Sequence, residues 1–158
     1  LFTILSLNKV SNLKKKSIII IKMLTEIISG LWIGNINDAF NEDFYHDNLI
    51  TVAINCTFEQ GFLDIPNIKK IRIPLTDKLE PSRDLRLLKE NINQITDFIH
   101  DKLEDNNIFV YCYNGVTISP LIVALYMIKK GDISKDMIRD ILRSKNKDIC
   151  LDFDLSFF

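Results

Sequence analysis

One stretch decides the fold of this chain: Ile108-Phe-Val-Tyr-Cys-Tyr-Asn-Gly-Val-Thr-Ile-Ser-Pro120, followed at once by Leu121-Ile-Val-Ala-Leu-Tyr-Met-Ile128. Residues 108–111 form an apolar, β-branched and aromatic run with the length of a core strand. The run after Pro120 is apolar on every side, which is typical of a helix enclosed by protein. The stretch therefore predicts a strand, a tight loop and a buried helix, with Cys112 between the strand and the helix.

The position of Cys112 gives it chemical interest. Backbone N–H groups in such a loop and at a helix N-terminus converge on one spot, and their partial positive charge favours a thiolate or a phosphate there. An alternative is a two-residue β-hairpin at Asn114-Gly115, in which Cys112 would be an ordinary half-buried strand residue. Ser119 as an N-cap, with Pro120 in the first turn, favours the loop and helix instead.

The segment Val110-Tyr-Cys-Tyr-Asn-Gly-Val-Thr-Ile-Ser-Pro120, running into Ala124-Leu-Tyr-Met127, resembles the signature loop of the dual-specificity (cysteine-dependent) protein phosphatases. That loop has the pattern His-Cys-x-x-Gly-x-x-Arg-Ser. Cys112 matches its nucleophile, Gly115 its glycine and Ser119 its hydroxyl residue. The resemblance implies an α/β fold with a central, mostly parallel sheet of about four or five strands flanked by helices.

Two positions of the loop depart from the family pattern. Tyr111 stands where the family has histidine, and Ile118 stands where it has the phosphate-binding arginine. In the family, the backbone amides of the loop cradle the phosphate oxygens. The corresponding residues here are Tyr113, Asn114, Gly115, Val116, Thr117 and Ile118.

The resemblance also assigns a general acid. Asp77, in the polar loop 75–82, stands where the family has the aspartate that protonates the leaving oxygen. Such a group works only within hydrogen-bond reach of that oxygen. Taken alone, a loop aspartate is more often a solvated turn residue, and Asp84, just before a helix, is placed to cap it.

The missing arginine has a large expected effect. No Lys or Arg lies between Tyr111 and Ile128. A charge-assisted hydrogen bond contributes about 1.5–3 kcal/mol, so losing two removes about 3–6 kcal/mol of phosphate and transition-state binding. That corresponds to roughly a hundred- to ten-thousandfold in rate. The sequence therefore predicts a pseudophosphatase: a catalytically impaired domain that acts as a protein-binding or scaffolding module, its partner a protein with or without phosphate.

Two alternatives remain open from the sequence. The first is a weakly active protein tyrosine or serine/threonine phosphatase, with Cys112 as nucleophile and an arginine from elsewhere, such as Arg83 or Arg86. The second is a structural α/β subunit with an inert cysteine. His46 and His100 lie far from Cys112 in sequence, so a Cys–His protease pair has no support, and both are expected at the surface.

Composition limits the kinds of binding partner and the cellular compartment that we expect for this chain. The formal net charge of −1 argues against nucleic-acid binding, and the apolar run 17–21 is too short to span a bilayer. The cysteines Cys56, Cys112 and Cys150 lack zinc or disulfide spacing. We therefore expect no metal, no cofactor and a reducing, intracellular, cytoplasmic location. Loop lengths resemble those of viral family members most closely, which would place the protein in the host cytoplasm.

Residues 1–22 are expected to be an N-terminal extension, either non-native or an arm, ahead of a phosphatase-like domain at 23–158. Within that domain, a 3-4-3-4 spacing predicts a helix ending near Leu103 that buries one stripe. The stripe consists of Leu85, Leu88, Ile92, Ile95 and Ile99. A short helix is expected around Ala39, and Ser134 is expected to cap a last one. The expected strands are 30–34, 49–55, 68–74 and 108–111.

Overall fold

The computed structural model describes residues 24–158, and the predicted extension at 1–22 lies outside them. None of the helices in this described part combines the length and the apolar character that crossing a bilayer requires. Along the chain the elements are β1 (Thr25–Ile28), β2 (Leu31–Asn35), η1 (Asp38–Phe40), α2 (Glu42–Asp47), β3 (Ile50–Asn55), β4 (Lys69–Arg72), η2 (Pro81–Leu85), α3 (Arg86–Leu103), β5 (Asn107–Cys112), α4 (Ile118–Lys130), α5 (Ile138–Lys145) and η3 (Leu155–Phe157).

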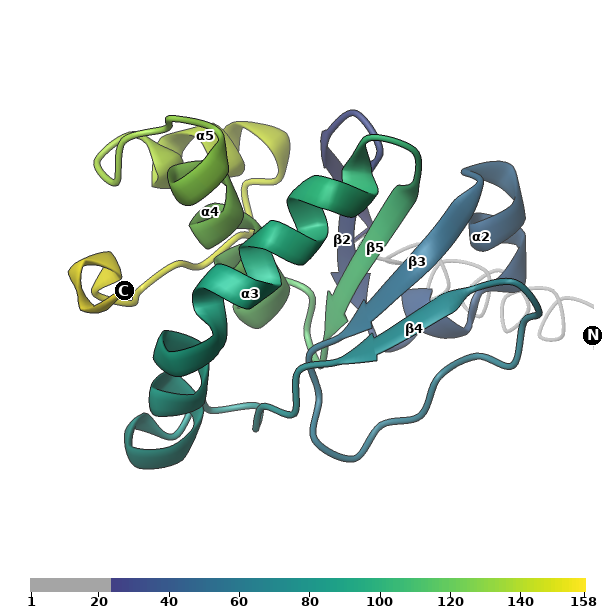
Figure 1. Cartoon of the computed structure of the whole chain (residues 1–158), viewed down its shortest axis with the longest axis horizontal. Helices are drawn as coiled ribbons and strands as arrows, with labels where there is room; N and C mark the ends of the chain where they lie inside the picture. The colour runs from purple at the N-terminus through teal and green to yellow at the C-terminus, as the bar shows by residue number, and fades with distance from the viewer. Residues whose placement is uncertain (1–23) are drawn as a thin grey trace, which may run out of the picture.

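The strands form one five-stranded sheet in the order β1-β2-β5-β3-β4, with β5 in the middle (Figure 1). β1 runs antiparallel to β2, and all other neighbours are parallel. Cys112 ends the central strand, and α4 begins at Ile118. The predicted α/β architecture and the strand–loop–helix assignment are therefore confirmed, and the β-hairpin alternative at Asn114-Gly115 is wrong.

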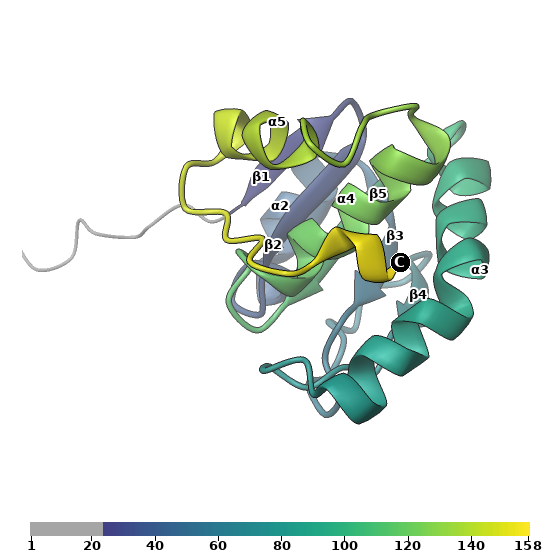
Figure 2. The same ribbon diagram turned by 90° about the vertical axis from the view of Figure 1, so that its left-hand side faces the viewer.

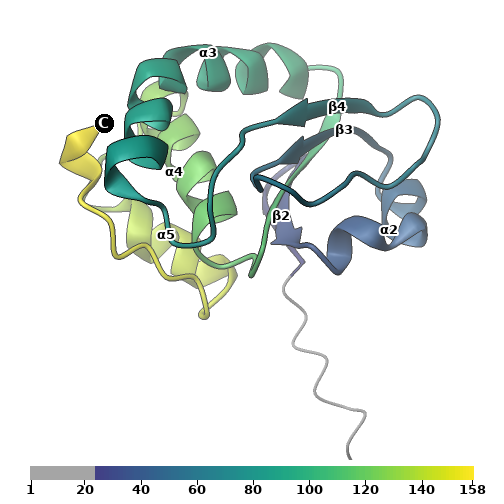
Figure 3. The same cartoon turned by 90° about the horizontal axis from the view of Figure 1, so that it is seen from below.

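The sheet is covered on both faces. Helices α3, α4 and α5 gather on one face and α2 lies on the other (Figure 3). The C-terminal segment crosses the first of these faces in front of α4 (Figure 2). Strand β5 contributes side chains to the hydrophobic core on each face of the sheet, because successive side chains of a strand point to opposite faces. Ile108, Val110 and Cys112 join the core under α3 and α4, whereas Phe109 and Tyr111 join the core beside α2.

Helix α3 carries the periodic stripe that the sequence predicts. Leu88, Ile92 and Ile99 are buried, and the helix ends at Leu103 as expected. Leu85, which precedes α3 in η2, and Ile95 are only half-buried. The two histidines are exposed, also as expected. Strand β1 was not among the predicted strands. It is short, and it reaches the sheet through a hairpin whose Gly30 adopts φ +78°.

Three predicted caps are wrong. Ser119 lies inside α4, whose N-cap is Thr117, because its hydroxyl is used in tertiary contacts. Ser134 lies ahead of a turn, and its carbonyl accepts the N–H groups of Met137 and Ile138. Helix α5 begins only at Ile138, so Ser134 does not cap it. Asp84 does not cap α3, because its carboxylate binds the loop before it.

The short helix expected around Ala39 is displaced. Ala39 itself lies in the 3-10 turn η1, and the α-helix α2 follows it. Asn41 sets the start of α2, since its side-chain oxygen accepts the N–H of Phe44 at 3.4 Å. This is the usual N-cap interaction, and it satisfies a backbone donor that the first turn of a helix would otherwise leave unpaired.

Candidate active site

Cys112 lies at the base of the signature loop and is wholly buried, with 0% of its surface exposed. The Gly115 N–H donates to its Sγ at 3.3 Å. Ser119 Oγ lies 3.3 Å from the same sulfur and donates to the Gly34 carbonyl. The Gly115 amide thus points at the sulfur, and Ser119 links Cys112 to strand β2.

Gly115 is the residue that lets the loop close. Its φ is +74°, in the left-handed region that L side chains rarely adopt. A Cβ at this position would lie 2.9 Å from the Asn35 nitrogen and 2.9 Å from the Gly34 carbonyl carbon. Backbone atoms cannot move aside cheaply, so both the turn and the close approach of the loop to β2 require glycine.

Asn114 binds the donors of its own loop. Its Oδ1 accepts the Val116 N–H at 3.0 Å, the Thr117 N–H at 3.2 Å and the Thr117 hydroxyl at 3.0 Å. The Cys112 thiol points at the same oxygen at 3.7 Å. The carboxamide oxygen therefore takes amide donors that the family's loop offers to a phosphate oxygen. The sequence signal for this was weak: asparagine often accepts N–H groups from the residues that follow it.

Ile118 occupies the arginine position as a core residue. It is 1% exposed and belongs to the cluster under α3 and α4. Tyr111, at the histidine position, is also buried, and it points to the opposite face of the sheet. Its hydroxyl donates to the Gly61 carbonyl at 3.1 Å, and burial raises its pKa. Tyr111 thus anchors the loop after β3.

Asp77 lies exposed on the turn that follows β4. Asp84 holds both ends of this turn. Its Oδ2 accepts the Thr76 N–H at 3.1 Å and the Glu80 N–H at 2.9 Å, and it also accepts the Thr76 hydroxyl. Asp84 itself is fully buried. The structure therefore gives Asp77 a defined, solvent-facing position in a loop that Asp84 holds in place.

The two arginines considered as substitutes for the missing clamp differ in their surroundings. Arg86 pairs with Glu90 at 2.8 Å along the exposed side of α3. Arg83 lies with its guanidinium 4.3 Å from the centre of the Phe58 ring. The Phe58 N–H donates to the Tyr113 hydroxyl at 3.3 Å. Arg83 is therefore connected to the signature loop through one aromatic residue, and Arg86 is not.

Two further residues bear on the loop and were not predicted to do so. The Cys150 N–H donates to the Val116 carbonyl at 2.8 Å, so the C-terminal segment braces the loop. Cys56 follows β3 and is fully buried in the same core as Cys112. Burial, and then the neighbouring Cys112, raise the pKa of the Cys56 thiol. Chain-distant contacts of this kind leave no local sequence pattern.

Comparison with known proteins identifies the family. Residues 31–157 match the family described as "Dual specificity phosphatase, catalytic domain". The chain belongs to this family. This dual specificity phosphatase domain is 30% identical over 111 residues to Dual specificity protein phosphatase 22 of Mus musculus, covering 69% of the chain and 56% of that relative. The chain spans about half the length of the curated relatives it matches.

Solved structures show the same fold. Human DUSP28 superposes with a TM-score of 0.73 at 18% identity, covering 85% of this chain and 86% of that one. Human tyrosine phosphatase-like serine/threonine/tyrosine-interacting protein superposes with a TM-score of 0.69 at 17% identity, covering 85% and 89%. The resemblance to viral members stays a prediction, as does the intracellular location.

Proposed function

We propose that this dual specificity phosphatase domain is catalytically impaired and acts as a protein-binding or scaffolding module. The observation that carries the proposal is that an isoleucine occupies the position of the phosphate-binding arginine. Ile118 is buried in the apolar core, and no Lys or Arg lies between residues 111 and 128. A phosphate dianion in the loop would therefore lack the bidentate guanidinium contact that neutralises it.

The closed loop supports the same proposal. Attack on phosphorus needs the sulfur within about 3–3.5 Å of it, yet Cys112 has no exposed surface. A substrate would have to displace the Asn114 carboxamide from the Val116 and Thr117 amides. Each of these amides would exchange its hydrogen bond to Asn114 for one to the phosphate. The loop therefore offers little net binding energy to an incoming phosphate.

A partner role is the natural use of such a domain, because the fold and its surface loops persist without the chemistry. One solved protein of this fold is named for interaction with serine/threonine/tyrosine proteins and is called phosphatase-like. For this chain we propose a protein partner, phosphorylated or not, that contacts the face around the signature loop.

The proposal is tested by steady-state hydrolysis of a generic aryl phosphate. The wild-type chain, Cys112→Ser and Ile118→Arg are compared at equal concentration. We expect wild type and Cys112→Ser to share one background rate and Ile118→Arg to exceed both. A wild-type rate that Cys112→Ser abolishes would mean that the domain is an active phosphatase.

The weakly active phosphatase is a second candidate that one observation favours. Arg83 lies on Phe58, which contacts Tyr113 of the signature loop. Swinging of this exposed side chain toward the loop would supply a cation. Arg83→Gln should then lower any Cys112-dependent rate, whereas Arg86→Gln, the matched control on α3, should leave it unchanged. Equal effects of the two substitutions would remove this candidate.

A further inference from the structure

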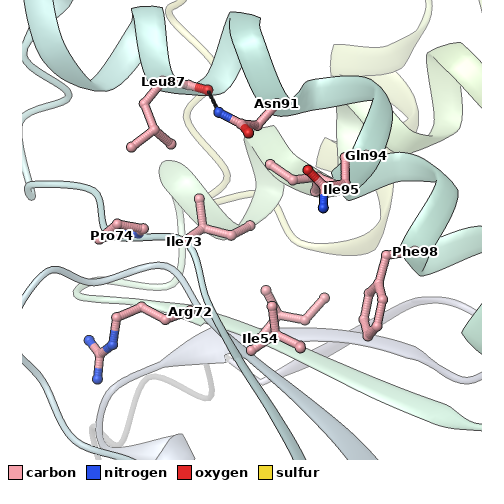
Figure 4. A pocket seen from close by; sticks show the side chains of 10 residues that line it. Ile54, Arg72, Ile73, Pro74, Leu87, Asn91, Gln94, Ile95 and Phe98 are labelled. Carbon is pink, nitrogen blue, oxygen red and sulfur yellow. Dashed lines mark hydrogen bonds between the residues drawn. The ribbon is translucent and has the colours of Figure 1, made fainter.

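A groove lies between helix α3 and the edge strand β4 (Figure 4), and none of the residues that line it belongs to the signature loop. Its volume is about 360 Å³. Ile71 and Ile54 form its sheet side, while Leu87, Ile95 and Phe98 line it from α3. Figure 4 also shows the Gln94 carboxamide pointing into the groove. Leu87, Ile95 and Phe98 are half-buried and pack against the edge of the core, so α3 leaves part of its apolar surface open in this groove.

The strand below this stripe ends the sheet. In the described part of the chain β4 pairs only with β3. The Ile73 N–H donates to the Asn55 carbonyl at 2.9 Å, and backbone groups of a strand alternate in direction. The backbone groups of Ile71 therefore face β3, and those of Lys70 and Arg72 face the open edge. Such an edge is a template for another extended segment.

The charged residues of β4 are all basic. Arg72 is among the residues that line the groove, but its guanidinium lies over the Phe62 ring on the other face of the sheet and donates to the Thr57, Phe58 and Gln60 carbonyls. Lys69 lies beside the groove, with its ammonium 5.2 Å from the centre of the Phe98 ring. Lys70, between these two basic residues, is exposed and has only a long contact of 3.9 Å with Asp64, which is itself fully exposed. A segment lying along β4 would therefore gain from carrying carboxylates.

We propose that the groove binds an extended, acidic segment of a partner protein, which adds to β4 as a further strand. Its aliphatic side chains, at every second position, enter the groove under α3, and its carboxylates point to the opposite face of the sheet, on the side of Lys70. A second copy of this chain is a poorer occupant, because pairing β4 with β4 would bring these like charges together. The site shares no residue with the signature loop, so the test of this binding proposal does not depend on whether the phosphatase chemistry is impaired.

The test uses synthetic peptides and the full chain. A fluorescent peptide that alternates glutamate and valine is compared with one that alternates lysine and valine, and binding is followed by anisotropy. Amide resonances of the labelled protein locate the contact. We expect only the acidic peptide to bind, shifting resonances of β4 and of the Phe98 region and leaving those of residues 113–117 in place.

Two variants probe the two parts of the site. Lys70→Pro removes an edge-facing N–H while keeping the β3 pairing, because proline is tolerated at that kind of position. Its matched control, Lys70→Thr, keeps the N–H and loses only the charge. We expect Lys70→Pro to weaken binding at least about tenfold and more than Lys70→Thr does. Ile95→Glu places a carboxylate in the groove, and we expect it to abolish binding of the acidic peptide.

Several results would overturn the proposal. They are equal binding of the acidic and basic peptides, shifts centred on residues 113–117, or full binding by Lys70→Pro with an otherwise unchanged spectrum. Concentration-dependent dimerisation of the chain alone that shifts the β4 resonances would also overturn it, in favour of a second copy.

Discussion

Replacing Asn114 by alanine should open the signature loop to anions. In the wild-type chain the Asn114 oxygen accepts three hydrogen bonds from the loop. A neutral hydrogen bond contributes about 0.5–1.5 kcal/mol net, so together they favour the closed loop by about 1.5–4.5 kcal/mol. An anion competes with this closed state, and its apparent affinity is reduced by the fraction of open molecules. Asn114→Ala should therefore raise the affinity for inorganic phosphate about ten- to a thousandfold.

The assay is a phosphate titration followed through the Val116 and Thr117 amide resonances. The wild-type chain should bind phosphate with a Kd in the millimolar range or weaker, since it lacks the phosphate-binding arginine. Asn114→Asp is the matched control: it keeps the acceptor oxygens, adds a negative charge and should show no gain. If Asn114→Ala and wild type bind phosphate with the same Kd, the reasoning that Asn114 fills an anion position is wrong.

Three other predictions concern single residues. Ile118→Arg should recover part of the hydrolysis of an aryl phosphate, and adding Tyr111→His should change it non-additively, because both positions shape one loop; a double variant no faster than wild type would count against the missing cation as the main defect. Gly115→Ala should lower the free energy of unfolding by about 1–3 kcal/mol in urea melts, because of its φ of +74° and the contact with β2; an unchanged midpoint would contradict this. Burial raises the pKa of the Cys56 thiol, so the folded state keeps a proton that the unfolded state releases above about pH 8.5, and the free energy of unfolding should fall there by up to about 1.4 kcal/mol per pH unit. Cys56→Ala should flatten that slope in melts at rising pH, and an identical slope would refute the assignment.

The sequence predicted the central strand, the loop and α3 because each has a local physical signal. An apolar run of strand length ended at Cys112, and a 3.6-residue period ran to Leu103. Caps were predicted less well, since a serine or aspartate near a helix start has several possible partners. Ser119 binds the Gly34 carbonyl and contacts Cys112 instead, and Asp84 binds the loop that carries Asp77.

The hydrogen bonds that close the signature loop could not be predicted from the sequence, for a related reason. In the sequence Asn114 is one residue of the loop, and only the three-dimensional path of the loop brings the Val116 and Thr117 amides to its oxygen. The contact between Cys150 and Val116 joins segments far apart in the chain. The isoleucine at position 118, by contrast, was identified through the resemblance to the family's signature loop, and the structure adds that its side chain is buried.

The central claim is that Cys112 does not transfer phosphate at a useful rate. A single-turnover experiment, with protein in excess over an aryl phosphate, tests it most directly, because the phenol is released in the step in which the sulfur attacks. We predict that wild type and Cys112→Ser release phenol at the same background rate. A faster release by wild type that Cys112→Ser eliminates would contradict the account.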